Sequence, residues 1–149
     1  MMSRFRLLND FTHENYSILI ECACKESQYF SLTTFKYYHK KDLNNSYFEL
    51  LSYLTEYEQD KFKFNLPKHY SRAHVHVYEL NQNTKSILFY VNKLYDWCPP
   101  YFPEDLCFYK GKKIWFESIS HEHMSFLYTE NINLKILPKQ FEFIELTIN

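Results

Sequence analysis

Glycine is almost absent from this chain: Gly111 is the only one in 149 residues. P-loops, dinucleotide fingerprints and nucleophile elbows each need two or more glycines, because the backbone there approaches a ligand closely or takes a positive φ. None of these motifs can be written in this sequence. The sequence therefore argues against nucleotide-dependent chemistry by the common routes, and no cofactor is expected.

An excess of charge of one sign is also missing. The formal net charge is -1, and the basic residues occur singly or in short runs such as Lys40-Lys41 and Lys112-Lys113. Nucleic-acid binding relies on a positive field, so a nucleic-acid partner is not expected. Residues 1–17 lack the apolar core of a signal peptide, and no apolar run is long enough to span a membrane. These features predict a cytoplasmic protein without a membrane partner.

Cysteine is sparse, with four residues and no Cys-x-x-Cys spacing. Cys22 and Cys24 are predicted to share one face of a strand, as reduced thiols. Cys98 follows the end of a predicted helix, where the dipole disfavours a thiolate, and Cys107 lies in a predicted buried strand. A cysteine nucleophile is therefore disfavoured.

Aromatic residues, in contrast, are abundant, with 14 Tyr, 14 Phe and 2 Trp making up 20% of the chain. A core built largely of aromatic side chains accounts for the number of phenylalanine residues. A buried tyrosine needs a partner for its hydroxyl, so several tyrosines are expected to be half exposed. Exposed tyrosine is typical of recognition surfaces.

The spacing of apolar residues predicts one α+β domain over residues 1–149, a sandwich with a mostly antiparallel sheet and two main helices on one face. The late run of strands favours this class over alternating α/β units. The predicted elements are a strand at 16–24, a helix at 46–58, a half-buried strand at 72–80, a helix at 81–97, a stiff proline loop at 98–105, a hairpin at 106–119 turning at Gly111, and strands at 123–128 and 141–148.

Two His-x-His pairs are the clearest candidate ligands: His74 with His76, and His121 with His123. Residues two apart on a strand share a face, so two neighbouring strands would bring four imidazoles toward tetrahedral zinc geometry. This arrangement defines one hypothesis, a small metal-dependent hydrolase. The other interpretation is that the histidines are outward polar positions on half-buried strands.

Polar residues also flank the predicted hairpin. Glu104 and Asp105 precede it, and Ser120, His121 and Glu122 follow it. The two acids would act as an acid and a base only if burial separated their pKa values. We favour a structural interpretation, in which the Ser-His-Glu turn is hydrogen-bonded to the proline loop and holds the hairpin rigid.

Residues 94–128 resemble a group of small bacterial proteins of unassigned role, whose C-terminal halves share the pattern L-Y-x-W-x-x-P-x-x-P-E-D-L-x-F, a Trp and S-H-E. Members are often labelled similar to stage III sporulation protein AH, a membrane-anchored protein whose label does not carry over. The resemblance implies a shared motif and fold without an activity. His123 has no counterpart in the pattern. The matching residues are Leu94, Tyr95, Trp97, Pro100, Pro103, Glu104, Asp105, Leu106, Phe108, Trp115, Ser120, His121 and Glu122.

The leading functional hypothesis is a non-enzymatic protein-binding module, immunity-like, that occludes a toxin partner. The metal-dependent hydrolase on His74, His76, His121 and His123 is the alternative, and a homodimer that consumes the aromatic surface is a third possibility. The residues predicted to bind the partner are Trp97, Tyr101, Glu104, Asp105, Trp115, Ser120, His121 and Glu122.

Overall fold

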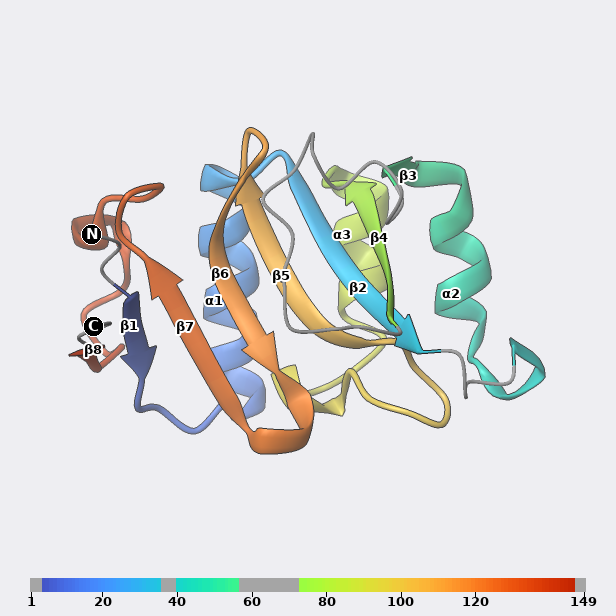
Figure 1. The fold of residues 1–149 in the computed structure, drawn as a ribbon, viewed down its shortest axis with the longest axis horizontal. Coiled ribbons are helices and arrows are strands. Elements are labelled where there is room, and N and C mark those ends of the chain that lie inside the picture. Colours follow the sequence, from blue (N-terminus) through green and yellow to red (C-terminus); the bar gives the residue numbers. More distant parts are fainter. Residues whose placement is uncertain (1–3, 36–39, 57–72, 147–149) are drawn as a thin grey trace.

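The fold is an eight-stranded antiparallel sheet with helices packed on one of its faces (Figure 1). The structure is a computed structural model, and it describes residues 4–35, 40–56 and 73–146. The strand order is β3-β4-β2-β5-β6-β7-β1-β8. The strands are β1 (Arg4–Leu7), β2 (Tyr29–Phe35), β3 (Leu54–Glu56), β4 (Ala73–Glu79), β5 (Glu104–Lys110), β6 (Lys113–Ile119), β7 (Met124–Tyr128) and β8 (Phe143–Leu146). The helices are α1 (His13–Glu26), α2 (Asn45–Leu50) and α3 (Gln82–Leu88), with short 3-10 turns η1 (Lys40–Asp42), η2 (Leu51–Tyr53), η4 (Leu94–Asp96), η5 (Ser120–Glu122) and η6 (Leu134–Ile136).

This arrangement confirms the predicted α+β class and the mostly antiparallel sheet. Figure 1 shows α1 and α3 behind the central strands, while α2 stands at the β3–β4 end of the sheet. The predicted hairpin and the strands at 72–80, 123–128 and 141–148 are confirmed by β4 to β8, while residues 72, 147 and 148 lie outside the described part of the chain. Among the described residues, no helix is long and apolar enough to cross a membrane.

The prediction of a strand at 16–24 is wrong, because this segment belongs to α1. Its buried residues, Tyr16, Leu19, Ile20 and Ala23, recur at intervals of three and four, which is a helical stripe. Thr12 begins the helix by accepting a hydrogen bond from the backbone N–H of Asn15. Cys22 and Cys24 therefore do not share the face of a strand.

The two other helices are shorter than predicted. In the 46–58 segment, α2 gives way to η2 and then to β3, and residues 57–58 lie outside the described part. In the 81–97 segment, α3 ends at Leu88, whose carbonyl accepts a hydrogen bond of 2.5 Å from the Tyr16 hydroxyl. That carbonyl would otherwise accept from residue 92, so the contact with α1 satisfies the end of α3.

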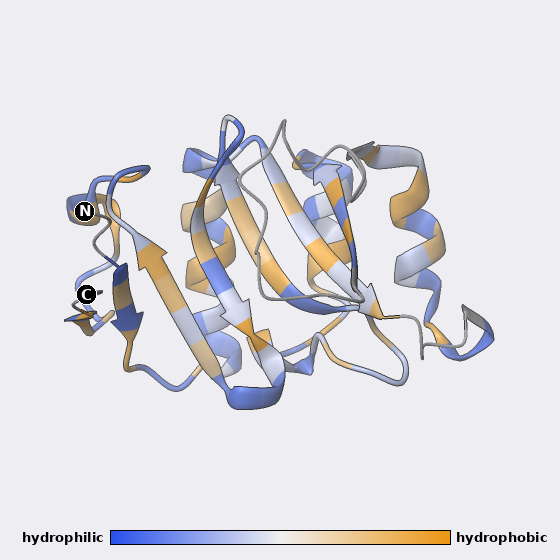
Figure 2. Ribbon diagram, in the orientation of Figure 1, coloured by the Kyte–Doolittle hydropathy of each residue, from blue (hydrophilic) through white to orange (hydrophobic). Residues whose placement is uncertain are grey.

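Apolar residues occupy both faces of the central strands. The larger core lies between the sheet and the helices, and the smaller one, on the opposite face, contains Val75, Val77, Cys107, Tyr109 and Ile114. Figure 2 shows hydrophobic residues recurring along the central strands, and hydrophilic ones in the turns that join β5 to β6 and β6 to β7. The prediction that β4 is half-buried is wrong, because β4 lies inside the sheet and its two faces are both covered.

Burial of tyrosine is expected to make the fold less stable in alkali. Burial raises the pKa of Tyr128 to about 12 and also raises the pKa values of Tyr16, Tyr78 and Tyr109 well above their ordinary value. In the unfolded chain these phenols ionise near an ordinary pKa of about 10. Above that pH the unfolded state binds fewer protons than the folded state, so the free energy of unfolding falls as the pH rises. Urea titrations across the alkaline range test this, and a constant free energy there would contradict it.

Candidate functional site

The predicted contact of Glu104 and Asp105 with the Ser-His-Glu turn is confirmed, but these two residues begin β5 and do not belong to the proline loop as predicted. The Ser120 N–H donates to Asp105 Oδ1 at 2.8 Å, and the Asp105 N–H donates to Ser120 Oγ at 3.3 Å. Next to this reciprocal pair, His121 Nε2 lies 3.0 Å from Glu104 Oε2. The start of β5 is thereby fixed to the end of β6, and the contact stabilises the hairpin.

Backbone geometry supports the same structural role. Asp105 has a φ of 62°, in the left-handed region that aspartate and asparagine tolerate better than most residues. His123 ends η5 with a φ of 50°, and its ring stacks on Tyr95 at a centroid distance of 4.8 Å. His123 is therefore a packing residue of the turn.

Both tryptophans lie inside the protein. The Trp97 indole N–H donates to the Tyr16 hydroxyl at 2.9 Å, and the Trp115 indole N–H donates to Ser27 Oγ at 2.7 Å. Each indole is fully buried and has a partner, as a buried tryptophan requires. The two rings join α1 to the loop after η4 and to β6, and they are unavailable to a partner protein.

Burial therefore corrects the predicted binding site. Three of the eight residues are exposed, namely Tyr101, His121 and Glu122. The other five are buried and make their contacts within the fold. These buried residues are Trp97, Glu104, Asp105, Trp115 and Ser120.

The four histidines do not form one site. In the sheet order, β2 and β5 separate β4 from the β6–β7 connection that carries the second pair. His76 Nε2 instead lies 3.2 Å from Thr34 Oγ1 on β2, whereas His121 contacts Glu104. Over residues 4–35, 40–56 and 73–146, no group of three or more His, Cys, Asp or Glu side chains is arranged to hold a metal ion. The predicted four-histidine metal site is therefore wrong, because the strand order keeps its two halves apart.

The thiols are poor nucleophiles. Burial raises the pKa of Cys22 to about 11 and raises the pKa of Cys107 well above its ordinary value. Cys107 is fully buried in β5, which agrees with the predicted inert role. Burial is also the main cause of the raised pKa values of Cys24 and Cys98. All four thiols are protonated at neutral pH, and none has the low pKa of a catalytic cysteine.

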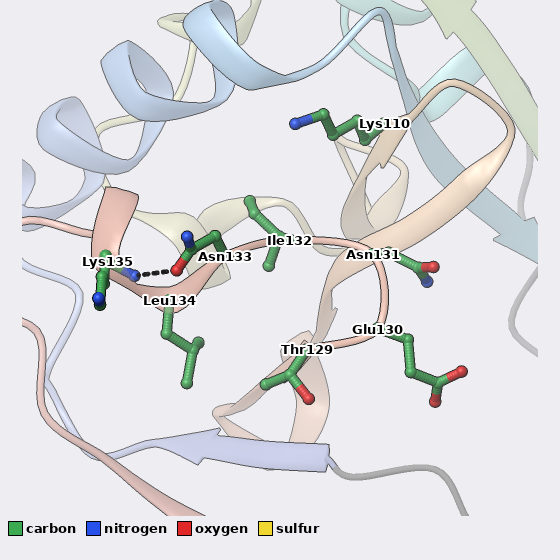
Figure 3. Close-up of a pocket in the computed structure, with 8 residues that line it drawn as sticks. All are labelled: Lys110, Thr129, Glu130, Asn131, Ile132, Asn133, Leu134 and Lys135. Atoms are coloured by element: carbon green, nitrogen blue, oxygen red, sulfur yellow. Dashed lines mark hydrogen bonds between the residues drawn. The ribbon is translucent and has the colours of Figure 1, made fainter.

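An open pocket of about 690 Å³ lies between the tip of the β5–β6 hairpin and the segment that follows β7 (Figure 3). Lys110 lines it from the hairpin, and its Nζ lies 3.2 Å from the Glu26 carboxylate. The Asn131 amide donates to the Ile114 carbonyl at 2.6 Å, so this side chain stabilises the fold. Among the described residues that line the pocket, none is a buried polar residue, and we assign the pocket no ligand. Its lining residues are Lys110, Thr129, Glu130, Asn131, Ile132, Asn133, Leu134 and Lys135.

Exposed apolar side chains gather instead around α2. Tyr90 lies beside it, with its hydroxyl donating to Glu49 Oε2 at 2.5 Å, and the Tyr101 carbonyl accepts from the Asn44 N–H at 2.5 Å, at the start of α2. We call this set the α2 surface. It consists of Phe48, Leu51, Leu54, Tyr90 and Tyr101, with exposed fractions of 48%, 43%, 39%, 45% and 64%.

The α2 surface holds five of the seven large hydrophobic side chains that are exposed within the described ranges. The other two, Leu8 and Ile144, lie at the opposite end of the sheet order, on or next to the adjacent strands β1 and β8. Except for Tyr101, sequence reasoning missed the α2 surface. A signal was present, because Glu49 is the single charged residue between Leu43 and Thr55.

No model of a known protein family matches the sequence, and no curated protein or solved structure is significantly similar to it.

Proposed function

We propose that this chain is a protein-binding module that holds one partner protein on the α2 surface. The observation that carries the proposal is the gathering of exposed apolar side chains around one short helix. Depletion of charge and enrichment in aromatic residues mark the centre of protein interfaces. Phe48 and Tyr90 supply the aromatic anchors, and the charge-poor run from Leu43 to Thr55 supplies the centre.

The chemistry of the α2 surface defines the kind of partner. Phe48, Leu51 and Leu54 require an apolar counterpart, and Glu49 is the one charge within the run that forms the surface. A carboxylate that already accepts from Tyr90 has further lone pairs for a cation. The partner we propose presents an apolar patch with a lysine or arginine positioned to reach Glu49.

Occlusion of a partner by a small domain is how immunity proteins act, and we propose this class for the chain. It requires only a rigid surface, without a cofactor or an open catalytic site. The α2 surface meets this requirement, because the Asn44 side chain caps α2 and Tyr90 braces it through Glu49. The partner would then lose its own activity when it binds.

The test begins by retrieving the partner on immobilised chain and then measures the dissociation constant with the purified partner. Phe48→Asp is expected to weaken binding about 30-fold or more, because a buried aromatic anchor is typically worth 2 kcal/mol. Asn45→Asp is the matched control, since it adds the same charge at an exposed polar position of the same helix. Binding that Phe48→Asp leaves unchanged would rule out the α2 surface.

The chemical class of the partner is tested by Glu49→Gln, which keeps the shape of the side chain and removes its charge. The variant is expected to weaken binding and to reduce its dependence on salt. The activity of the retrieved partner with and without the chain tests occlusion. A partner that stays fully active when bound would contradict the immunity-like class while leaving the binding surface intact.

A further inference from the structure

A second group of exposed apolar side chains lies at the end of the sheet opposite the α2 surface. Leu8 and Ile144 are 50% and 47% exposed, and together with the α2 surface they complete the set of exposed large hydrophobic side chains in the described ranges. Figure 1 shows β1 and β8 at one end of the molecule and α2 at the other. The two groups therefore do not cover each other within one copy of the chain.

Pairing of β1 with β8 places an arginine beside these two side chains. Arg6 lies opposite Ile144, and the Leu8 N–H donates to the Glu142 carbonyl, which continues the same register by one more pair. Opposite residues share a face of the sheet, as do residues two apart on one strand, so Arg6, Leu8 and Ile144 lie on one face. Leu7 belongs to the main core, so that face points away from the helices. We call Arg6, Leu8 and Ile144 the β1–β8 patch.

Arg6 is the cation of the β1–β8 patch. Arg4, two residues earlier on the same strand, is engaged within the fold, because its guanidinium lies 4.3 Å over the Phe126 ring. Arg6 is partly exposed, and none of the ion pairs between described residues involves it. The patch therefore combines two exposed apolar side chains with one arginine that can reach an acid of another molecule.

We propose that the β1–β8 patch of one copy of this chain binds the α2 surface of a second copy when no partner protein occupies it. The inference rests on the proposed function of the α2 surface, whose partner must present apolar side chains and a lysine or arginine that reaches Glu49. The β1–β8 patch has both features, since Leu8 and Ile144 are apolar and Arg6 is the cation. Self-association covers the α2 surface until the partner protein displaces the second copy.

Charge determines how the two copies are oriented. Glu49 is the one charge within the run that forms the α2 surface, and it lies next to Arg6 of the second copy. The reverse orientation would bring Glu49 toward Glu142, an exposed acid paired with Leu8, and like charges repel each other. The contact joins two different surfaces, so it is heterologous, and each assembly keeps one unused surface at each end. Further copies therefore add head to tail.

The contact is expected to be weak, because the β1–β8 patch offers only two large apolar side chains, so concentrated protein is required. Sedimentation velocity measures the assembly over a wide range of concentration. The mean sedimentation coefficient of the wild type is expected to keep rising with concentration beyond the value of a dimer. A closed dimer, or a wild-type chain that stays monomeric at every concentration, would overturn the proposal.

Two single variants test the contact from its two sides. Ile144→Glu and Phe48→Asp are each expected to weaken self-association about tenfold or more, because each places a carboxylate in an apolar contact. An equimolar mixture of the two variants is expected to form a 1:1 complex and nothing larger, since each variant keeps one intact surface. Variants that do not combine would contradict the heterologous contact. Self-association lost in Phe48→Asp and kept in Ile144→Glu would indicate two α2 surfaces in contact, which also overturns the proposal.

Gln28→Glu is the matched control, since it adds the same charge at an exposed position just before the central strand β2. It is expected to leave self-association unchanged, and far-ultraviolet circular dichroism confirms that the three variants fold. The orientation is tested by Glu49→Arg and Arg6→Glu. Each is expected to weaken self-association alone and to restore it when both are combined in one chain. A double variant as weak as the single ones would contradict the proposed pairing of charges.

Failure of this proposal is distinguishable from failure of the proposed function. Partner binding by a chain that does not self-associate would rule out the self-association alone. If Phe48→Asp breaks self-association but leaves binding of the partner protein unchanged, the proposed function fails and the α2 surface serves self-association only. If both hold, adding the partner protein is expected to dissociate the wild-type assemblies.

Discussion

Replacing Trp97 by alanine is expected to lower the free energy of unfolding by about 4 kcal/mol. The indole is fully buried, lies edge-on to Phe102 at a centroid distance of 5.4 Å, and donates its N–H to the Tyr16 hydroxyl. Its removal leaves a large cavity in the main core and leaves Tyr16 with one partner fewer. Urea denaturation of both proteins, fitted for midpoint and slope, measures the difference.

Tyr16→Phe separates the hydrogen bonds from the volume. The Tyr16 hydroxyl accepts from Trp97 and donates to the Leu88 carbonyl, so its loss leaves a buried donor and a buried acceptor without this partner. We expect this change to cost about 1–3 kcal/mol. Tyr101→Ala is the control for an aromatic truncation at the surface. A cost for Trp97→Ala no larger than that of Tyr101→Ala would contradict the structural role assigned to the indole.

Local patterns predicted the C-terminal half of the fold. The Lys110-Gly111-Lys112 turn between two apolar runs indicated the hairpin, and the structure places Gly111 there with a φ of 57°. The strand prediction for α1 is wrong because β-forming residues such as Ile18 and Ile20 occur in the same segment as the helical stripe. The helix depends on the Thr12 cap and on packing against the sheet, and tertiary contacts override strand propensity in such a segment.

Strand order could not be predicted, and the metal hypothesis depended on it. Spacing alone established that His74 and His76 share a face of β4, but not that β2 and β5 lie between them and His121. The central strand β2 was itself missed. Its Ser31 and Thr33 resemble a polar loop in the sequence, yet Ser31 Oγ lies 2.9 Å from the Tyr109 hydroxyl inside the sheet.

Composition predicted an aromatic surface but not its place. Tryptophan is a frequent interface anchor, so Trp97 and Trp115 were natural choices for a binding site. In the structure Trp97 donates to the Tyr16 hydroxyl and Trp115 donates to the Ser27 hydroxyl, both inside the protein. A count of aromatic residues cannot distinguish a buried tryptophan from one at a binding surface. The scarcity of charge between Leu43 and Thr55, where Glu49 is the single charged residue, is the pattern that indicates the α2 surface.

Asp105→Ala is expected to lower the free energy of unfolding by about 3 kcal/mol, the second large effect. Asp105 and Leu106 together lie opposite the single Leu32 of β2, which makes a bulge at the start of β5. Asp105 adopts a φ of 62° there, and its carboxylate accepts from the Ser120 N–H. Alanine loses the acceptor and strains the left-handed backbone at the same time.

Two further substitutions at Asp105 separate these two contributions in urea denaturation. Asp105→Asn keeps an acceptor and tolerates a positive φ, so we expect a loss of about 1 kcal/mol, whereas Asp105→Gly keeps the backbone freedom alone and should lose about 2 kcal/mol. The expected order of stability is therefore wild type, Asn, Gly and Ala. Equal losses for Gly and Ala would show that the positive φ carries no strain. An Asn variant as unstable as Ala would show that the negative charge of Asp105, and not the geometry of the turn, holds the hairpin to the loop.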